Sequence, residues 1–425
     1  MTHADLLVEV RRDLHERLLG RVDARQLARV PAAERRLRVR EEALVLLNEQ
    51  GHMLPQRALT NVVNAVSDAV VGMGPIEFLL KDPDVTEVMV NGPDDVYVER
   101  EGRLEKVGDR LFEGEEAVFH VIERIVAPLG LRVDAMSPWV DARLPEGSRV
   151  HAIVPPLSLC GPVLNVRKFS SVPFGPDDLL TNGTVGPRML AFLDACVRGR
   201  CNIVISGGTS SGKTTLLAVL SSFVPDDERI ITIEDAAELR LGKPHVIGLE
   251  ARPANVESRS EITVRDLLRN ALRMRPDRLV IGEVRGGEAL DMLQAMNTGH
   301  DGSLSTAHAN SPRHALWRIE TMALMSDVDL PVAHVRAQVA GGIDVVVHTA
   351  RLREGRRVVM QIATVDGLNE GGDLAVTEVF EFRSRVGRDG AFVATGNVPA
   401  VAATLRGRIA LDERCFEPGI DDIER

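Results

Sequence analysis

The sequence predicts an α/β domain with a mostly parallel sheet, preceded by a smaller α+β domain and a helical segment. From Pro187 onward, apolar runs alternate with helical patterns, as in parallel strands joined by covering helices. Between residues 75 and 169, short strand-like runs and tight turns surround one helical pattern. Before that, apolar residues recur at three- and four-residue steps, which indicates helices.

The composition narrows the possible functions. The 425 residues are 44% hydrophobic and 27% charged, which is ordinary for a globular protein of two or three domains. A net charge of −11 and 3% aromatic residues argue against nucleic acid as a partner. Without a signal-peptide pattern or a long apolar run, we expect a cytoplasmic protein. Its cysteines lack zinc spacing and are expected to be reduced, mostly buried thiols.

Residues 1–74 predict a helical N-terminal segment. The apolar positions of a first helix are Leu6, Leu7, Val10, Leu14 and Leu18. A second pattern, from Glu34 to Asn48, carries Leu37, Leu44, Val45 and Leu47. A small helical subdomain explains both patterns, and a role in partner binding or oligomerisation is the alternative.

Residues 75–169 predict the α+β domain, which includes a hairpin that turns at residues 145–148. Strands are expected at 85–90, 96–99 and 163–167, and the hairpin at 139–153. A helix is expected at 113–129. Arg143, Arg149 and Arg167 lie in this domain. They are either ordinary surface arginines or a source of positive charge for bound phosphates.

Residues 170–186 are rich in glycine and proline and predict a linker, which leaves 187–425 as the α/β domain. Its expected buried strands are 229–233, 278–281, 302–306 and 343–348, followed by further C-terminal strands.

A glycine-rich loop between the apolar run 202–206 and a helical pattern fits G-x-x-x-x-G-K-[ST] at every specified position. In this setting backbone N–H groups and the helix N-terminus surround phosphate oxygens. Lys213 is expected to reach the terminal phosphates and Thr214 to hold Mg²⁺. An ordinary glycine turn would not need all these positions. The expected binding residues are Gly207, Gly208, Thr209, Ser210, Ser211, Gly212, Lys213, Thr214 and Thr215.

Three further clusters follow predicted strands, whose carboxyl ends meet at the ligand-binding edge of a parallel sheet. Glu234 and Asp235 could hold Mg²⁺ or position water, or could form an acidic turn that caps a helix. Glu283 is the expected carboxylate that polarises water, although Gly282 occupies the preceding position, where an aspartate is common. The alternative for Glu283 is a solvent-facing side chain paired with a nearby arginine. His308 could contact the terminal phosphate or be structural.

In this order the motifs resemble those of the type II/type IV secretion ATPase family. The matching segments after the loop are Ile-Thr-Ile-Glu-Asp at 231–235, Arg-Pro-Asp-Arg-Leu-Val-Ile-Gly-Glu-Val-Arg-Gly at 275–286 and Thr-Gly-His-Asp-Gly-Ser-Leu-Ser-Thr-Ala-His-Ala-Asn at 298–310. The N-terminal segments 85–92 and 96–104 look like the CpaF/TadA-type branch of tight-adherence (Flp) pili. The resemblance covers roughly residues 75 to 425.

This resemblance implies a RecA-like P-loop NTPase domain behind a PAS-like N-terminal domain. Glu234 falls in the family's Asp box, and Glu283 is its catalytic glutamate, preceded typically by glycine. His300 and His308 fall in its His box. Arg143 and Arg149 match the arginines that the family's N-terminal domain brings to the nucleotide. From the residues themselves, Arg167 is a further expected nucleotide contact, and the expected Mg²⁺ ligands are Thr214, Glu234 and Glu283.

The function expected from the resemblance is Mg²⁺-dependent ATP hydrolysis by a homohexamer. Such a motor would dock on inner-membrane pilus or secretion proteins without spanning the membrane itself. Two alternatives remain open on the sequence: a ring-shaped nucleic-acid translocase and a regulatory module that binds nucleotide without turnover.

Overall fold

The computed structural model divides the chain into two compact units, Met1–Ser170 and Ser171–Arg425. It describes Val10, Arg21, Val30 and residues 13–14, 17–18, 32–49, 55–100, 102–108, 110–144, 146–168, 174–252, 261–385, 388–409 and 411–422. Within these residues, no helix combines the length and apolar character needed to cross a membrane.

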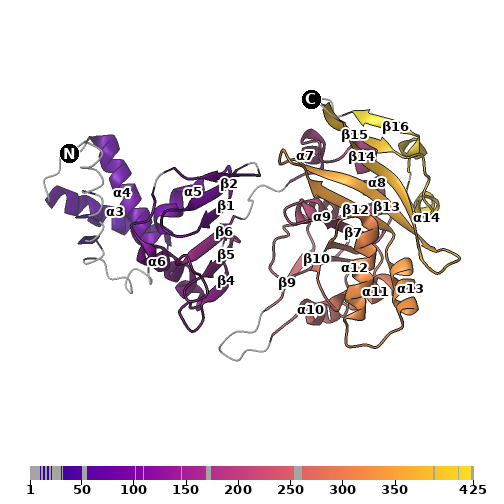
Figure 1. The fold of residues 1–425 in the computed structure, drawn as a ribbon, viewed down its shortest axis with the longest axis horizontal. Coiled ribbons are helices and arrows are strands. Elements are labelled where there is room, and N and C mark those ends of the chain that lie inside the picture. The colour runs from indigo at the N-terminus through magenta and orange to yellow at the C-terminus, as the bar shows by residue number, and fades with distance from the viewer. Residues whose placement is uncertain are drawn as a thin grey trace. The chain divides into compact units, whose positions relative to one another are not determined.

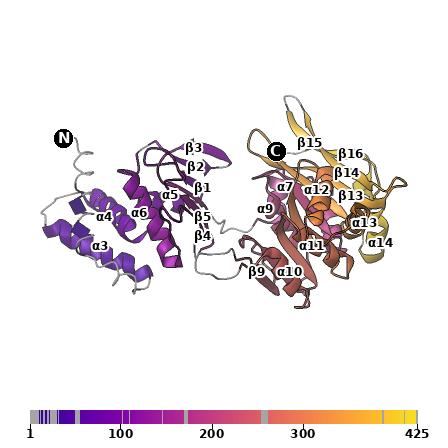
Figure 2. The same cartoon turned by 60° about the horizontal axis from the view of Figure 1, so that its bottom comes forward.

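The first unit begins with helices that share a small core. Helices α3 (Ala32–Glu49) and α4 (Gln56–Val71) lie side by side (Figure 2). Their core includes Leu14 and Leu18 of the first predicted helix, whereas Leu6 and Leu7 lie outside the described residues.

The predicted inner face of α3 is wrong in part. Leu47 is buried, but the side chains of Leu37, Leu44 and Val45 are 58%, 39% and 45% exposed. Val39, Ala43 and Leu46 point inward instead. The segment is rich in leucine and valine on all sides, so periodicity alone did not identify the buried face.

A six-stranded antiparallel sheet follows, in the order β3-β2-β1-β6-β5-β4. Helix α6 (Glu115–Val126) packs its apolar side on this sheet (Figure 1). The predicted strands, helix and hairpin of this region are confirmed. The other elements are α5 (Glu77–Lys81), the 3-10 turns Gly74–Ile76 and Ala127–Leu129, and strands β1 (Val85–Val90), β2 (Val96–Arg100), β3 (Arg103–Lys106), β4 (Trp139–Arg143), β5 (Arg149–Ile153) and β6 (Val163–Arg167).

The predicted linker is in part a structured piece of the second unit. Helix α7 (Pro176–Thr181) begins within it. The side chains of Leu179 and Val185 are each only 2% exposed and belong to the second unit's core. Proline opens α7 at its first turn, where its missing N–H costs nothing, so the composition of a linker also suited a short helix.

The second unit is built on a ten-stranded sheet in the order β16-β15-β14-β13-β12-β7-β11-β10-β8-β9. The predicted parallel arrangement holds from β12 to β9, whereas the C-terminal strands add antiparallel neighbours. The strands are β7 (Ile203–Gly207), β8 (Ile230–Glu234), β9 (Val246–Glu250), β10 (Arg278–Val284), β11 (Leu304–His308), β12 (Val345–Arg351), β13 (Arg357–Leu368), β14 (Leu374–Arg385), β15 (Arg388–Ala394) and β16 (Gly419–Asp422).

Helices cover both faces of the parallel part (Figure 1). Helices α8 (Pro187–Arg198) and α9 (Lys213–Ser222) pack on one face, in a core with clustered phenylalanine rings around Phe192. The opposite face carries α10 (Val264–Ala271), α11 (Glu288–Asn297), α12 (Pro312–Leu324) and α13 (Val332–Gly342). The unit ends with α14 (Val401–Arg408) and the 3-10 turn Glu413–Phe416.

Candidate active site

The glycine-rich loop joins the end of β7 to the start of α9. Gly207 has a φ of 158°, and a Cβ there would lie 2.4 Å from the carbonyl oxygen of Thr349. Gly212 has a φ of 92°, in the left-handed region that side chains disfavour. Both positions therefore require glycine, and the loop's path follows from them.

Lys213 is the first residue of α9 and is buried. Its Nζ atom donates to the carbonyl oxygen of Gly208 at 2.9 Å and lies 3.5 Å from Nδ1 of His308. The ammonium group of Lys213 thus lies against the backbone of the glycine-rich loop, where it could bind a phosphate.

The strand ends expected to share one edge do so. His308 ends β11 and is in register with Gly207 of the neighbouring β7. Glu283 lies near the end of β10, the next strand outward. Its Oε1 atom is 2.9 Å from Nε2 of His308, a close approach that is not aligned as a hydrogen bond. Lys213 of α9, His308 of β11 and Glu283 of β10 therefore lie next to one another on three adjacent elements.

The surroundings of His308 favour a neutral ring. Burial lowers its pKa first of all, the charge of Lys213 lowers it further, and Glu283 opposes both. Because an ammonium group can only donate, Nδ1 is the acceptor toward Lys213, and the ring proton is assigned to Nε2, facing Glu283. Neutral His308 can therefore connect the cation and the carboxylate.

Arg285 holds the other oxygen of Glu283. Its Nη2 atom donates to Oε2 at 2.9 Å, and this hydrogen bond is the main reason that the pKa of Arg285 is raised. Its Nη1 atom lies 3.4 Å from Asp235, which is exposed. Arg285 therefore fixes the orientation of the carboxylate from the solvent side.

Glu234 ends β8, beyond β10 in the sheet, and is buried. Its Oε2 atom accepts hydrogen bonds from the backbone N–H groups of Glu238 and Leu239, at 2.7 and 3.0 Å. Any contact with Mg²⁺ would thus fall to the other oxygen. A Cβ at Gly282 would lie 3.0 Å from Cγ of Glu234, so the glycine before Glu283 makes room for this side chain.

The chemistry of the loop fits a phosphate chain. A Cβ at Gly208 would enter open space, and α9 begins at Lys213 without a side-chain cap at Gly212, so the N-terminus of the helix faces the loop. Among the described residues, no three His, Cys, Asp or Glu side chains form a metal site by themselves. The Thr214 hydroxyl, in the first turn of α9, could supply one ligand to a Mg²⁺ ion that phosphate oxygens also bind.

Comparison with known proteins identifies the family. The model of the family described as type II/IV secretion system protein matches residues 69–367. A putative conjugal transfer protein of Mycobacterium tuberculosis is 40% identical over 302 residues, 70% of this chain and 85% of that protein. This chain belongs to the type II/IV secretion system family.

Two further proteins are similar to this chain, one in sequence and one in fold. The type IV secretion system protein PtlH of Bordetella pertussis is 36% identical over 323 residues, which cover 68% of this chain and 93% of that protein. The X-ray structure of the ATPase DotB from Yersinia pseudotuberculosis shares the fold, with a TM-score of 0.50 at 15% identity over 74% of this chain and 80% of that one.

His300, the other His-box residue of this secretion-family chain, is not at the site. It precedes β11, whereas His308 ends that strand, so the two lie at opposite edges of the sheet. There, the backbone N–H groups of Gly302 and Ser303 donate to Asn202, and Arg278 donates to the carbonyl oxygen of Gly302. The five-residue strand β11 lies between His300 and the ring of His308, so the two histidines of this segment do not share a site.

The sequence analysis missed residues of β12 that support the loop. Nδ1 of the buried His348 lies 3.0 Å from Oγ of Ser206. Oγ1 of Thr349 lies 2.9 Å from Oγ of Ser211 and donates to the carbonyl oxygen of Ser206 at 3.2 Å. A polar His-Thr pair that follows the apolar run 345–347 was the available signal.

In the first unit, the predicted arginines form a row. Arg143 of β4 is directly opposite Arg149 of β5, which is directly opposite Arg167 of β6. Paired residues share a face of a sheet, so the three side chains emerge together. The flanking Val150 and Val166 point to the other face, into the core.

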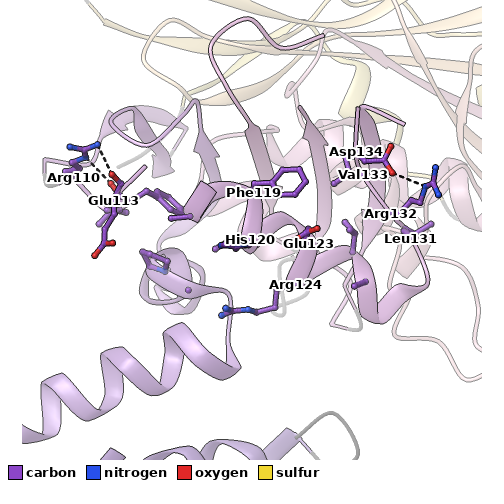
Figure 3. A pocket seen from close by; sticks show the side chains of 18 of the residues that line it. Arg110, Glu113, Phe119, His120, Glu123, Arg124, Leu131, Arg132, Val133 and Asp134 are labelled. Atoms are coloured by element: carbon purple, nitrogen blue, oxygen red, sulfur yellow. Dashed lines mark hydrogen bonds and ion pairs between the residues drawn. The ribbon is translucent and has the colours of Figure 1, made fainter. Parts of the chain in front are cut away.

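The first unit also contains a hollow of about 1300 Å³ that none of the predicted site residues line. Figure 3 shows His120 and Arg124 of α6 in its wall, with Arg110 beside Glu113 and Arg132 beside Asp134 at its rim. Arg124 donates to the carbonyl oxygen of Gly72. The candidate active site is the phosphate loop, where Lys213, His308 and Glu283 lie together, rather than this hollow.

Proposed function

We propose that this chain is an ATP-hydrolysing motor that works as a homohexamer at the inner membrane and powers pilus assembly or protein secretion. The observation that carries the proposal is the line from Lys213 through His308 to Glu283, which lies beside a phosphate loop. Membership of the secretion family supports the coupling to transport.

In the proposed reaction, loop N–H groups and Lys213 bind the phosphates of ATP. Mg²⁺, held by Thr214, would neutralise charge on the phosphate oxygens. Glu283 accepts a proton from a water molecule, whose oxygen attacks the terminal phosphorus as the bond to ADP breaks. His308 lies between the Glu283 carboxylate and Lys213, so its ring is placed to couple the protonation of Glu283 to the phosphate held by Lys213. Glu234 holds the backbone of Glu238 and Leu239 beside this centre.

The arginine row of the first unit is proposed to supply further positive charge. Arg143, Arg149 and Arg167 would contact the phosphates of a nucleotide in their own subunit or a neighbouring one. Their alignment on one face supports a shared anionic ligand, because several guanidinium groups on one face can donate to the same phosphate chain.

The proposed branch is the CpaF/TadA type of tight-adherence pili. Support comes from the segments 85–92 and 96–104 of the first unit, which form the strands β1 to β3 and their turns. Membrane partners would be inner-membrane pilus or secretion platform proteins, with the motor bound peripherally.

The test compares purified wild-type protein with two variants, in Mg²⁺ and ATP. Lys213→Ala should lose nucleotide affinity, since the ammonium binds both ground and transition states. Glu283→Gln should retain binding and lose about 100-fold or more in turnover. Wild-type turnover in Glu283→Gln would contradict the assignment. Light scattering at working concentration measures the oligomer, and a monomer that remains monomeric with nucleotide would refute the hexamer.

A further inference from the structure

One residue of the phosphate loop is held in a conformation that its side chain disfavours. Ser210 has a φ of 57°, in the left-handed region, although it is not glycine. An L-residue is destabilised there by the approach of its Cβ to its own backbone. In an isolated loop this serine would return to a negative φ, so an outside contact must oppose that change.

Arg357 supplies such a contact. Its Nε atom donates to the carbonyl oxygen of Ser210 at 3.1 Å. Its aliphatic chain also covers the next bend, since a Cβ at Gly212 would lie 3.1 Å from Cδ of Arg357. One side chain from outside the loop therefore contacts both residues that have left-handed backbones between Gly207 and Lys213.

The placement of Arg357 depends on the β12–β13 hairpin. Arg357 begins β13 and pairs with Arg351, the last residue of β12. The same β12 places Thr349 against Ser211, and against the carbonyl oxygen of Ser206. Two residues of the β12–β13 hairpin therefore contact the phosphate loop: Thr349 at Ser211 and Arg357 at Ser210.

We infer that Arg357 is a positioning residue that keeps the phosphate loop in its binding conformation before nucleotide arrives. It acts through the Ser210 carbonyl and not through contact with the nucleotide. The inference rests on the proposed nucleotide binding for its functional consequence. If Arg357 removes a cost of ordering the loop, replacing Arg357 must weaken nucleotide affinity. That loss of affinity must become smaller when residue 210 is one that adopts a left-handed backbone without strain.

A double-variant cycle tests this mechanism. The dissociation constant of a non-hydrolysable ATP analogue with Mg²⁺ is measured for wild type, Arg357→Ala, Ser210→Gly and the combination. Arg357→Ala should weaken binding about fivefold to thirtyfold, the equilibrium cost of one left-handed residue. In the Ser210→Gly background, where a left-handed backbone costs little, the same change should weaken binding by about twofold or less.

Hydrogen exchange without any nucleotide gives a second readout. Peptides that span 207–214 should exchange faster in Arg357→Ala, while those of β10 stay unchanged. The matched control is Arg356→Ala, an adjacent arginine whose guanidinium lies 5.7 Å from the ring centre of Phe382, and it should leave the loop's exchange as in wild type.

Equal losses of affinity in both backgrounds would overturn the inference, because they would mean that Arg357 contacts the nucleotide itself. Unchanged affinity with a lowered melting temperature would also overturn it and leave Arg357 a structural residue. If the wild type binds no nucleotide, the proposed function fails, and the exchange of peptides 207–214 still decides whether Arg357 holds the loop.

Discussion

Nε2 of His308 lies 2.9 Å from Oε1 of Glu283, while Nδ1 of the same ring lies 3.5 Å from Nζ of Lys213. The ring therefore connects the group proposed to activate water with the group proposed to hold phosphate. Since burial and Lys213 both lower the pKa of His308, the neutral ring is the form that makes this connection.

We expect His308→Ala to lower kcat about 10- to 100-fold with little change in nucleotide affinity, because it removes a contact to the reacting carboxylate. His308→Gln, which retains a donor and an acceptor, should recover part of that loss. Steady-state kinetics and analogue binding measure the two quantities separately. A rise in the dissociation constant with unchanged kcat would instead place His308 in ground-state phosphate binding.

Gly282→Ala should disturb the catalytic edge through Glu234. The added Cβ would lie 3.0 Å from Cγ of Glu234, whose carboxylate anchors the backbone of Glu238 and Leu239. We expect a loss of about 1–2 kcal/mol in unfolding free energy, and reduced kcat. Gly248→Ala, on β9 of the same sheet, is the matched control. Its Cβ would meet Thr232 at 3.4 Å, an ordinary contact. Equal effects of both variants would refute the steric explanation.

Stability should fall on acidification in part through His348. Burial, and next the charge of Lys213, lower the pKa of this histidine in the folded protein. Below about pH 6.5 the unfolded chain binds a proton that the folded protein excludes, so the unfolding free energy decreases as pH falls. Chemical denaturation at several pH values should give a shallower acid slope for His348→Asn. His308 acts in the same direction, so some slope remains. An identical slope in the variant would show that His348 does not contribute.

The sequence predicted the parts of the site whose geometry is local. A glycine at 207 and another at 212 are required by the backbone itself, and their spacing with Lys213 was readable from the pattern. Glu283 and His308 were placed together because parallel strands end at a common edge.

The parts not predicted depend on contacts between distant segments. Thr349 supports Ser211 across 138 positions of sequence, and Arg357 reaches Ser210 across 147. Both contacts require the register of β12 and its hairpin beside β7, which composition does not encode. Why Leu37, Leu44 and Val45 face outward on α3 has no explanation within the described residues.

Replacing Arg149 in the first unit should lower activity without lowering stability. It is flanked across the sheet by Arg143 on one side and Arg167 on the other, so its charge is repelled from both directions. Replacing it with glutamine keeps polarity and removes that repulsion. We therefore expect Arg149→Gln to leave the melting temperature unchanged or slightly raised, while ATP turnover falls about tenfold or more. Arg132→Gln, at an exposed ion pair with Asp134 in the same unit, is the control and should keep wild-type turnover. A clear loss of melting temperature in Arg149→Gln with normal turnover would mean that the arginine row stabilises the sheet and serves no nucleotide.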